Sequence, residues 1–217
     1  MSMIYFYLGM AIVIALIVYF YYFSLRKKKI PRTNSLYTDA LNAMVNGDIS
    51  NAVGLLKQVV KQDSNHVRAY LQLGNILRKE NPEQALKIHQ SLTVRPNLSR
   101  DIQVDIHTAL AEDYGFISNY KKAIEEAKLV LAIEKRNLWA LNFLINTSVE
   151  KQDWEEAIGW TKQLKKVTGK TTYEDEAKFD VFKGLDYLKS GDFEKAKIQF
   201  EKGIKVSPDY PPSYRYL

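Results

Sequence analysis

Hydrophobic positions recur with helical spacing through most of this 217-residue chain. Near the C-terminus, Phe193, Ala196, Phe200 and Ile204 follow one another at intervals of three and four residues. Intervals of that size place side chains on one face of an α-helix. The stretch therefore predicts an amphipathic helix that buries one face.

The same pattern returns along the chain in units centred on an alanine. Each alanine follows an apolar or aromatic residue by three positions, with proline in that place in one weaker copy. The alanines are spaced 33, 38, 34 and 39 residues apart and are Ala52, Ala85, Ala123, Ala157 and Ala196. Short polar turns rich in glycine, asparagine and aspartate divide each unit into two helical stretches. A period of this length predicts an array of helical hairpins.

The first segment of the chain has a different pattern. Residues 3–23 carry no formal charge, with aromatic residues at both ends and aliphatic residues in the middle. A helix of that length reaches about 30 Å, the thickness of the hydrocarbon core of a bilayer. We therefore predict a single transmembrane anchor over residues 1–25. A cleaved signal peptide is the alternative, but it would place positive charge before a shorter apolar core.

The formal net charge of +6 comes mostly from the region after this apolar run. The first 32 residues hold five basic and no acidic residues, which leaves 26 basic and 25 acidic residues in the rest of the chain. A nearly neutral body argues against nucleic acid as a partner. The basic cluster predicts a juxtamembrane linker over residues 26–33, contact with membrane lipid, and repeats that face the cytoplasm. The topology residues are Arg26, Lys27, Lys28, Lys29 and Arg32.

Two of the units carry more specific residues. One contains the run Tyr70-Leu71-Gln72-Leu73-Gly74, and the last contains Gly184, Tyr187, Ala196, Phe200 and Pro208. This combination resembles the tetratricopeptide repeat, a helical hairpin that stacks into an α-solenoid. The resemblance implies an all-α fold, in which the transmembrane helix precedes five repeats. We place the repeats at about residues 34–65, 67–97, 104–137, 138–171 and 177–210.

Two departures from the repeat pattern affect the expected packing and the end of the chain. Ala111 and Ile145 stand where this family usually has glycine, so we expect looser or differently angled helices there. Residues 211–217 match the opening of another first helix, and a solenoid normally ends with a polar capping helix. We therefore expect a truncated repeat and a longer parent protein, with a naturally short chain as the alternative.

The order of the segments sharpens the resemblance. A membrane span, a basic cluster and a second repeat with the runs 73–78 and 85–92 are similar to the lipopolysaccharide assembly protein B family. That resemblance implies a single-pass adaptor of the bacterial inner (cytoplasmic) membrane, which presents the deacetylase of the lipid A pathway to a membrane ATP-dependent protease. The alternative is a scaffold for secretion, division or pilus assembly. The family's rubredoxin-like zinc module cannot form here because the sequence contains no cysteine.

Residues that could carry catalysis are scattered. Only three histidines occur, and His89 takes a position usually filled by an interhelical aromatic residue, which predicts a packed histidine. Residues 168–172 resemble half of a phosphate-binding loop but lack its first glycine and a preceding strand. We therefore expect no enzyme, no cofactor and no metal site.

The remaining candidate is a surface for protein partners. In a solenoid of this kind the first helix of each repeat lines a concave groove. We expect the groove to bind an extended peptide through amides and arginines, with an exposed Trp139 as its aromatic anchor. A role in solubility is the alternative for each position. The predicted groove residues are Arg68, Leu71, Asn75, Arg78, Asp105, Thr108, Glu112, Trp139, Asn142 and Asn146, together with Val149.

Overall fold

The computed structural model describes residues 2–25, 33–169 and 173–216, and these residues form helices, turns and no strand. Two compact units divide the chain. The first, Met1–Asp63, contains α1 (Ser2–Leu25), α2 (Thr33–Val45) and α3 (Ile49–Gln62). The second, Ser64–Leu217, contains α4 (Val67–Leu77), α5 (Pro82–Thr93), α6 (Arg100–Phe116), α7 (Tyr120–Ile133), α8 (Leu138–Glu150), α9 (Trp154–Thr168), α10 (Tyr173–Lys189), α11 (Phe193–Val206) and the 3₁₀-helix η1 (Pro211–Ser213). The all-α expectation is confirmed for the described residues.

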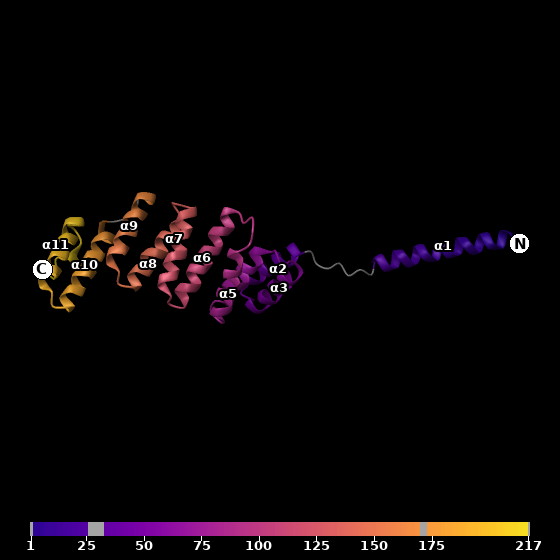
Figure 1. Cartoon of the computed structure of the whole chain (residues 1–217), viewed down its shortest axis with the longest axis horizontal. Helices are drawn as coiled ribbons and strands as arrows, with labels where there is room; N and C mark the ends of the chain where they lie inside the picture. The colour runs from indigo at the N-terminus through magenta and orange to yellow at the C-terminus, as the bar shows by residue number, and fades with distance from the viewer. Residues whose placement is uncertain (1, 26–32, 170–172, 217) are drawn as a thin grey trace. The chain divides into compact units, whose positions relative to one another are not determined.

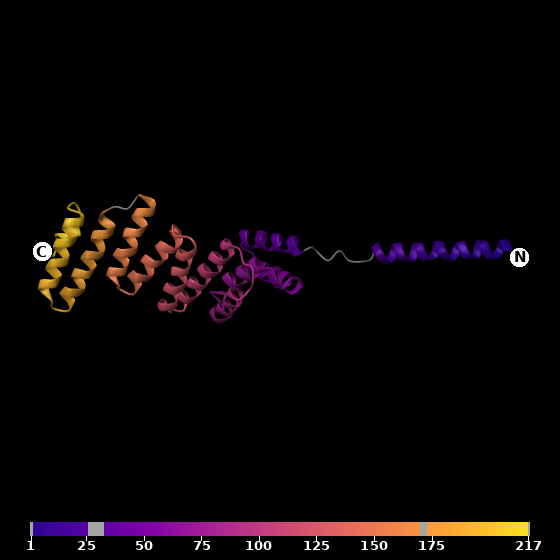
Figure 2. The ribbon, with the colours of Figure 1, turned by 45° about the horizontal axis from the view of Figure 1, so that its top comes forward.

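The helices of the second unit follow one another in chain order. Each helix packs against the next one, and Figures 1 and 2 show α6 to α11 side by side in the same sequence. Helices joined by short turns must run in opposite directions, so each pair forms a hairpin. Stacking these hairpins buries a continuous core that no single hairpin could form alone.

Left-handed residues end the first helix in four of the hairpins. The residues are Gly47, Ser118, Gln152 and Gly191, with φ values of 77°, 58°, 58° and 79°. The next residue then caps the second helix, and its side chain accepts a hydrogen bond from the backbone three positions later. These caps are Asp48, Asn119, Asp153 and Asp192. The turns lie where the sequence predicts them because αL and N-cap chemistry is local.

Small residues bring the paired helices close together. The five alanines that define the period are all at most 1% exposed. Gly74 faces His89, and a Cβ added at Gly74 would lie 2.3 Å from His89 Nε2. Gly184 faces Phe200 in the same way, with a Cβ 2.5 Å from Phe200 Cε1. In each contact the glycine leaves room for a large side chain on the second helix.

In the third repeat, the residues at this contact between the first and second helix differ in size from those of the second and fifth repeats. Ala111 replaces the glycine there and is fully buried, in a core cluster that also contains Ala127. Ala127 occupies the position of His89 and Phe200, four residues after the periodic alanine. A larger residue on the first helix is thus matched by a smaller one on the second. Both alanines are fully buried, so small side chains fill this contact. The expected looser or differently angled packing stays a prediction.

Two first helices begin earlier than the predicted repeats. Helix α6 starts at Arg100 and α10 at Tyr173, each four residues before the expected boundary. The added turns contain buried side chains, including Ile102 in α6 and Glu176 in α10. Burial of these side chains extends the helices beyond the part of the repeat that carries the sequence signature.

The end of the described chain differs from the expected α-helix. Pro211–Ser213 forms the 3₁₀-helix η1, and residues 214–216 form a turn. The amide of Tyr214 donates to the carbonyl of Pro211, which is the i to i+3 pattern of a 3₁₀-helix. Two successive prolines lack amide hydrogens and permit this tight turn. The Tyr216 ring stacks on Phe200 at 5.5 Å between centroids.

Two groups of residues that carry sequence predictions lie outside the described residues. The first is the set of topology residues Arg26, Lys27, Lys28, Lys29 and Arg32, and the second is residues 170–172 of the segment that resembles a phosphate-binding loop. None of the described helices is long and apolar enough to cross a membrane. The anchor predicted over residues 1–25 is therefore not shown by the structure.

Candidate functional site

A hollow of about 210 Å³ lies between α4 and α6. Residues one helical turn apart share a face, so each helix presents several side chains to the hollow. Helix α4 contributes Leu71, Gln72 and Asn75, and α6 contributes Asp105, Thr108, Ala109 and Glu112. The structure thus brings together five predicted groove residues, which are Leu71, Asn75, Asp105, Thr108 and Glu112.

Arg78 fixes α4 to α6 beside this hollow. Its Nε donates to Asp113 Oδ1 at 2.6 Å, and its Nη1 lies 2.7 Å from Glu112 Oε2. Its Nη2 donates to Asn75 Oδ1 at 2.7 Å and to the Ala109 carbonyl at 3.3 Å. All three guanidinium nitrogens therefore have protein partners, and the side chain is only 15% exposed. Arg78 therefore links Asn75, Glu112 and Asp113 beside the hollow, and its predicted contact with a ligand stays a prediction.

Asp113 and His89 continue this network into the core. Asp113 Oδ2 lies 2.6 Å from His89 Nδ1, and His89 Nε2 lies 3.2 Å from the Leu71 carbonyl oxygen. Both side chains are at most 1% exposed. The network links α4, α5 and α6, and His89 is packed as its repeat position predicted. Such a buried polar network fixes the arrangement of the helices around it.

Sequence reasoning missed Asp113. The residue follows Ala109, Leu110 and Ala111 and precedes Tyr114, all of them buried. An acidic residue on the apolar face of a helix is the signal that could have identified it, because buried charges are paired. Its partners are 24 and 35 residues away in sequence, so their identity required the structure.

The other predicted groove residues have different surroundings. Arg68 forms a 2.9 Å ion pair with Asp101, and both side chains are more than half exposed. Trp139 is half-buried, stacks on Phe143 at 5.0 Å and packs against a core cluster. The prediction that Trp139 is exposed is therefore wrong, whereas its role as an anchor stays a prediction. Phe143 lies one helical turn later, so helical spacing alone places the two residues on the same face.

The remaining residues of α8 also lie apart from the hollow. The Asn142 side chain donates to the Leu138 carbonyl at 2.8 Å, within its own helix. Asn146 is exposed, while Val149 packs against the core cluster of Ala157 and Ile158. The structure does not bring any of these three residues to the lining of the hollow between α4 and α6.

The pKa of Asp105, which lines the hollow, differs from its ordinary value. Partial burial of its carboxyl raises its pKa above the ordinary value, although the residue as a whole is exposed. Arg68 opposes this change, whereas the charges of Asp101 and Glu134 add to it. The pKa stays raised because desolvation outweighs the attraction to Arg68.

In the described part of the chain, no group of three or more histidine or acidic residues could hold a metal ion. His107 lies outside the hollow, with its Nδ1 2.7 Å from Glu126 Oε2, and both side chains are about one-fifth exposed. The hollow presents amide, hydroxyl and carboxylate groups, and such groups can recognise a ligand.

Comparison with known proteins agrees with the helical repeat. A family model described as tetratricopeptide repeat matches residues 181–210. Two solved structures are similar over most of the chain, and at these low identities they bear on the fold alone. MamA has a TM-score of 0.58 at 19% identity, covering 82% of this chain and 94% of that chain. YrrB, described as a TPR protein with an unusual peptide-binding site, has a TM-score of 0.58 at 14% identity, covering 88% and 94%.

Two curated relatives are similar in sequence. Lipopolysaccharide assembly protein B of Escherichia coli (strain K12) is 24% identical over 168 residues, and the match spans 77% of this chain but 43% of that protein. Type IV pilus assembly protein PilF of Pseudomonas aeruginosa is 29% identical over 172 residues, spanning 74% of this chain and 65% of that protein. The stacked hairpins, the family match and these relatives together support a tetratricopeptide repeat protein with an all-α solenoid fold.

Proposed function

We propose that this protein is a membrane-anchored scaffold that holds an extended segment of a protein partner in the hollow between α4 and α6. The observation that carries the proposal is the convergence of Leu71, Asn75, Asp105, Thr108 and Glu112 on that hollow. Amide, hydroxyl and carboxylate groups of this kind bind peptide backbone and side chains. The proposal assigns no catalytic step to the chain.

The rigid side of the hollow supports binding at low entropic cost. Asn75 Oδ1 accepts from Arg78, which fixes the amide and leaves its Nδ2 hydrogens as donors. Arg78 is in turn held by Asp113 in the core. A binding group whose orientation is already fixed loses little conformational freedom when the ligand arrives.

For the cellular role, we propose control of lipopolysaccharide synthesis. The chain would present the lipid A pathway deacetylase to a membrane ATP-dependent protease. The similarity to lipopolysaccharide assembly protein B supports this assignment. The similarity to the pilus assembly protein PilF favours the alternative, a scaffold of another envelope complex. In either role, confinement to a membrane raises the effective concentration of weakly bound partners.

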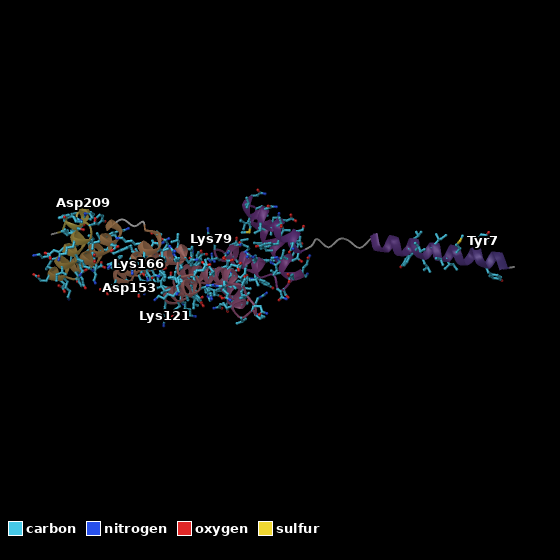
Figure 3. All side chains as sticks on the ribbon, turned by 90° about the horizontal axis from the view of Figure 1, so that it is seen from above. Tyr7, Lys79, Lys121, Asp153, Lys166 and Asp209 are labelled. Atoms are coloured by element: carbon cyan, nitrogen blue, oxygen red, sulfur yellow. The ribbon has the colours of Figure 1, made fainter. Side chains whose placement is uncertain are left out.

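For the location, we propose that residues 1–25 anchor the chain in the bacterial inner membrane, with the repeats in the cytoplasm. The uncharged run of residues 3–23 supports this proposal. Within helix α1, the side chains of Ile12, Leu16 and Ile17 are each more than half exposed. Tyr7, labelled in Figure 3, projects from the same helix. Lipid would cover this apolar surface, and the basic cluster after it supports the orientation.

A photo-crosslinking residue in place of Thr108 tests the groove and the cellular role together. In membranes that contain the full chain, we expect covalent capture of the deacetylase and the protease, identified by mass spectrometry. The matched control places the same crosslinker at the exposed Lys121 of α7, labelled in Figure 3, and should capture neither. Capture of pilus, secretion or division proteins at Thr108 would favour the alternative role. Equal capture at both positions would contradict the groove.

Two lysines in α1 test the anchor. Ile14→Lys combined with Ile17→Lys should release the full chain from bacterial membranes during extraction with alkaline carbonate. Each lysine at the centre of a span costs about 2.5–3.5 kcal/mol on the insertion scale. The matched control, Ile14→Leu with Ile17→Leu, should stay in the membrane pellet with the unaltered chain. If the unaltered chain is itself extracted into the supernatant, the anchor is refuted.

A further inference from the structure

We infer that the hollow between α4 and α6 receives the side chain of a lysine or arginine from the bound segment. This inference rests on the proposed function, because it names the chemistry of the ligand at the same site. It follows from the size of the hollow, the character of its surfaces and the balance of charge around it.

The size of the hollow suits one long side chain. Its volume of about 210 Å³ is below the range of about 300–1,000 Å³ that is usual for pockets that hold a whole small molecule. The hollow is also open to solvent, so an extended segment that lies across it could place one residue in it. An extended peptide presents alternate side chains to the same surface, which makes such an insertion simple.

The surfaces of the hollow match the two parts of a basic side chain. Leu71 and Ala109 are 4% and 3% exposed and form its apolar part. Asp105 and Glu112 supply carboxylates from α6, two helical turns apart. Lysine and arginine bury an aliphatic stem and keep a charged head among polar groups. An apolar floor with carboxylates beside it provides both environments.

The local charge favours a cation over an anion. Arg78 lies beside the hollow, but its positive charge is already paired with the carboxylates of Asp113 and Glu112. Glu112 uses Oε2 in that pair, and a carboxylate has a second oxygen that can accept further hydrogen bonds. Arg68 pairs with Asp101 at 2.9 Å. In and around the hollow, two arginines, Arg68 and Arg78, therefore stand against four acidic side chains, Asp101, Asp105, Glu112 and Asp113, the last of which also contacts His89.

The raised pKa of Asp105 agrees with the excess of acidic side chains around the hollow. Its pKa is raised by burial and by the charges of Asp101 and Glu134, and Arg68 does not compensate fully. A ligand cation placed near the carboxylate would supply the missing stabilisation. Protonation of Asp105 removes the charge that attracts the ligand, so binding should weaken as the pH falls below this raised pKa.

A peptide-selection experiment with the full chain in lipid nanodiscs tests the inference. A library of random eight-residue peptides is selected for binding, and each lysine or arginine in the selected peptides is then replaced by norleucine or methionine. We expect the selected peptides to share a basic residue, whose replacement weakens binding about tenfold or more, as for a charge-assisted hydrogen bond. The same replacement should have little effect when the protein carries Asp105→Asn or Glu112→Gln.

The variants separate a binding effect from a folding effect. Glu112 pairs with Arg78, so Glu112→Gln could disturb the network, whereas Asp105→Asn changes a residue that is exposed overall. Glu125→Gln, on the exposed surface of α7, is the matched control and should leave peptide selection and affinity unchanged. Loss of the dependence on a basic residue in Asp105→Asn, with circular dichroism unchanged, supports the inference.

The contrary results are distinct for the two proposals. If no peptide binds above background, the proposed peptide-binding function fails. If selected peptides bind in the groove but carry acidic or neutral residues, or if Asp105→Asn and Glu112→Gln leave their affinity unaltered, peptide binding stands and the inference of a basic side chain is overturned.

Discussion

Replacing Asp113 by alanine should lower the free energy of unfolding by about 3–5 kcal/mol. The substitution leaves Arg78 and His89 without the carboxylate that contacts both of them at 2.6 Å. His89 is fully buried and Arg78 largely so, and neither can recover the lost interactions from water without opening the contact between helices. Urea denaturation of the full chain in detergent, followed by circular dichroism, measures the change.

Asp101→Ala is the control for this prediction. Asp101 also pairs with an arginine on α4, at 2.9 Å, but both side chains are more than half exposed. A solvent-exposed pair contributes little to stability, so the denaturation midpoint should not move measurably. Similar shifts for Asp101→Ala and Asp113→Ala would show that burial of the network does not determine its contribution.

The loss at Asp113 should also affect the binding site. Without that carboxylate, Arg78 can turn from Asn75 and the Ala109 carbonyl, which it now holds at 2.7 and 3.3 Å. The hollow would then lose the fixed orientation of one of its amides. Stability and recognition are therefore coupled at this point, because the same guanidinium serves both the core and the surface.

The sequence alone predicts the hairpins well because their signals are local. Periodic alanines, left-handed turn residues and N-caps act within a few residues of each other, as Gly191 and Asp192 illustrate. The same locality explains why the groove positions on α4 and α6 could be chosen from helical spacing. The helix ends were less accurate, because burial of Ile102 and Glu176 adds turns that the repeat signature does not contain.

The site depends on contacts that no local pattern specifies. Arg78 and Asp113 are 35 residues apart, and their hydrogen bond holds the guanidinium beside the hollow. Trp139 differs, because Phe143 lies one helical turn later and the contact between their rings is local. The long-range pairing with Asp113 therefore decides the surroundings of Arg78, which helical spacing could not predict.

Gly184→Ala should lower the free energy of unfolding by about 1–3 kcal/mol, even though alanine is the better helix former. The new Cβ would lie 2.5, 2.8 and 2.9 Å from three ring carbons of Phe200. Phe200 is 1% exposed and its ring also stacks on Tyr216, so it cannot move aside without disturbing the packing of α11 and the end of the chain. Urea denaturation under the conditions used for Asp113→Ala gives the value.

Gly159→Ala is the matched control, because it makes the same substitution inside helix α9. Apart from its chain neighbours and the backbone of its own helix, no atom lies within 4 Å of a Cβ built at Gly159. Only helix propensity therefore changes, and stability should rise by about 0.5–1 kcal/mol. Phe200→Leu combined with Gly184→Ala should cost less than the sum of the two single changes, since the smaller side chain makes room for the methyl group. If the two costs add, Gly184 is required for a reason other than its contact with the Phe200 ring. The pairing of the larger Ala111 with the smaller Ala127 at the same contact in the third repeat would then need a different explanation.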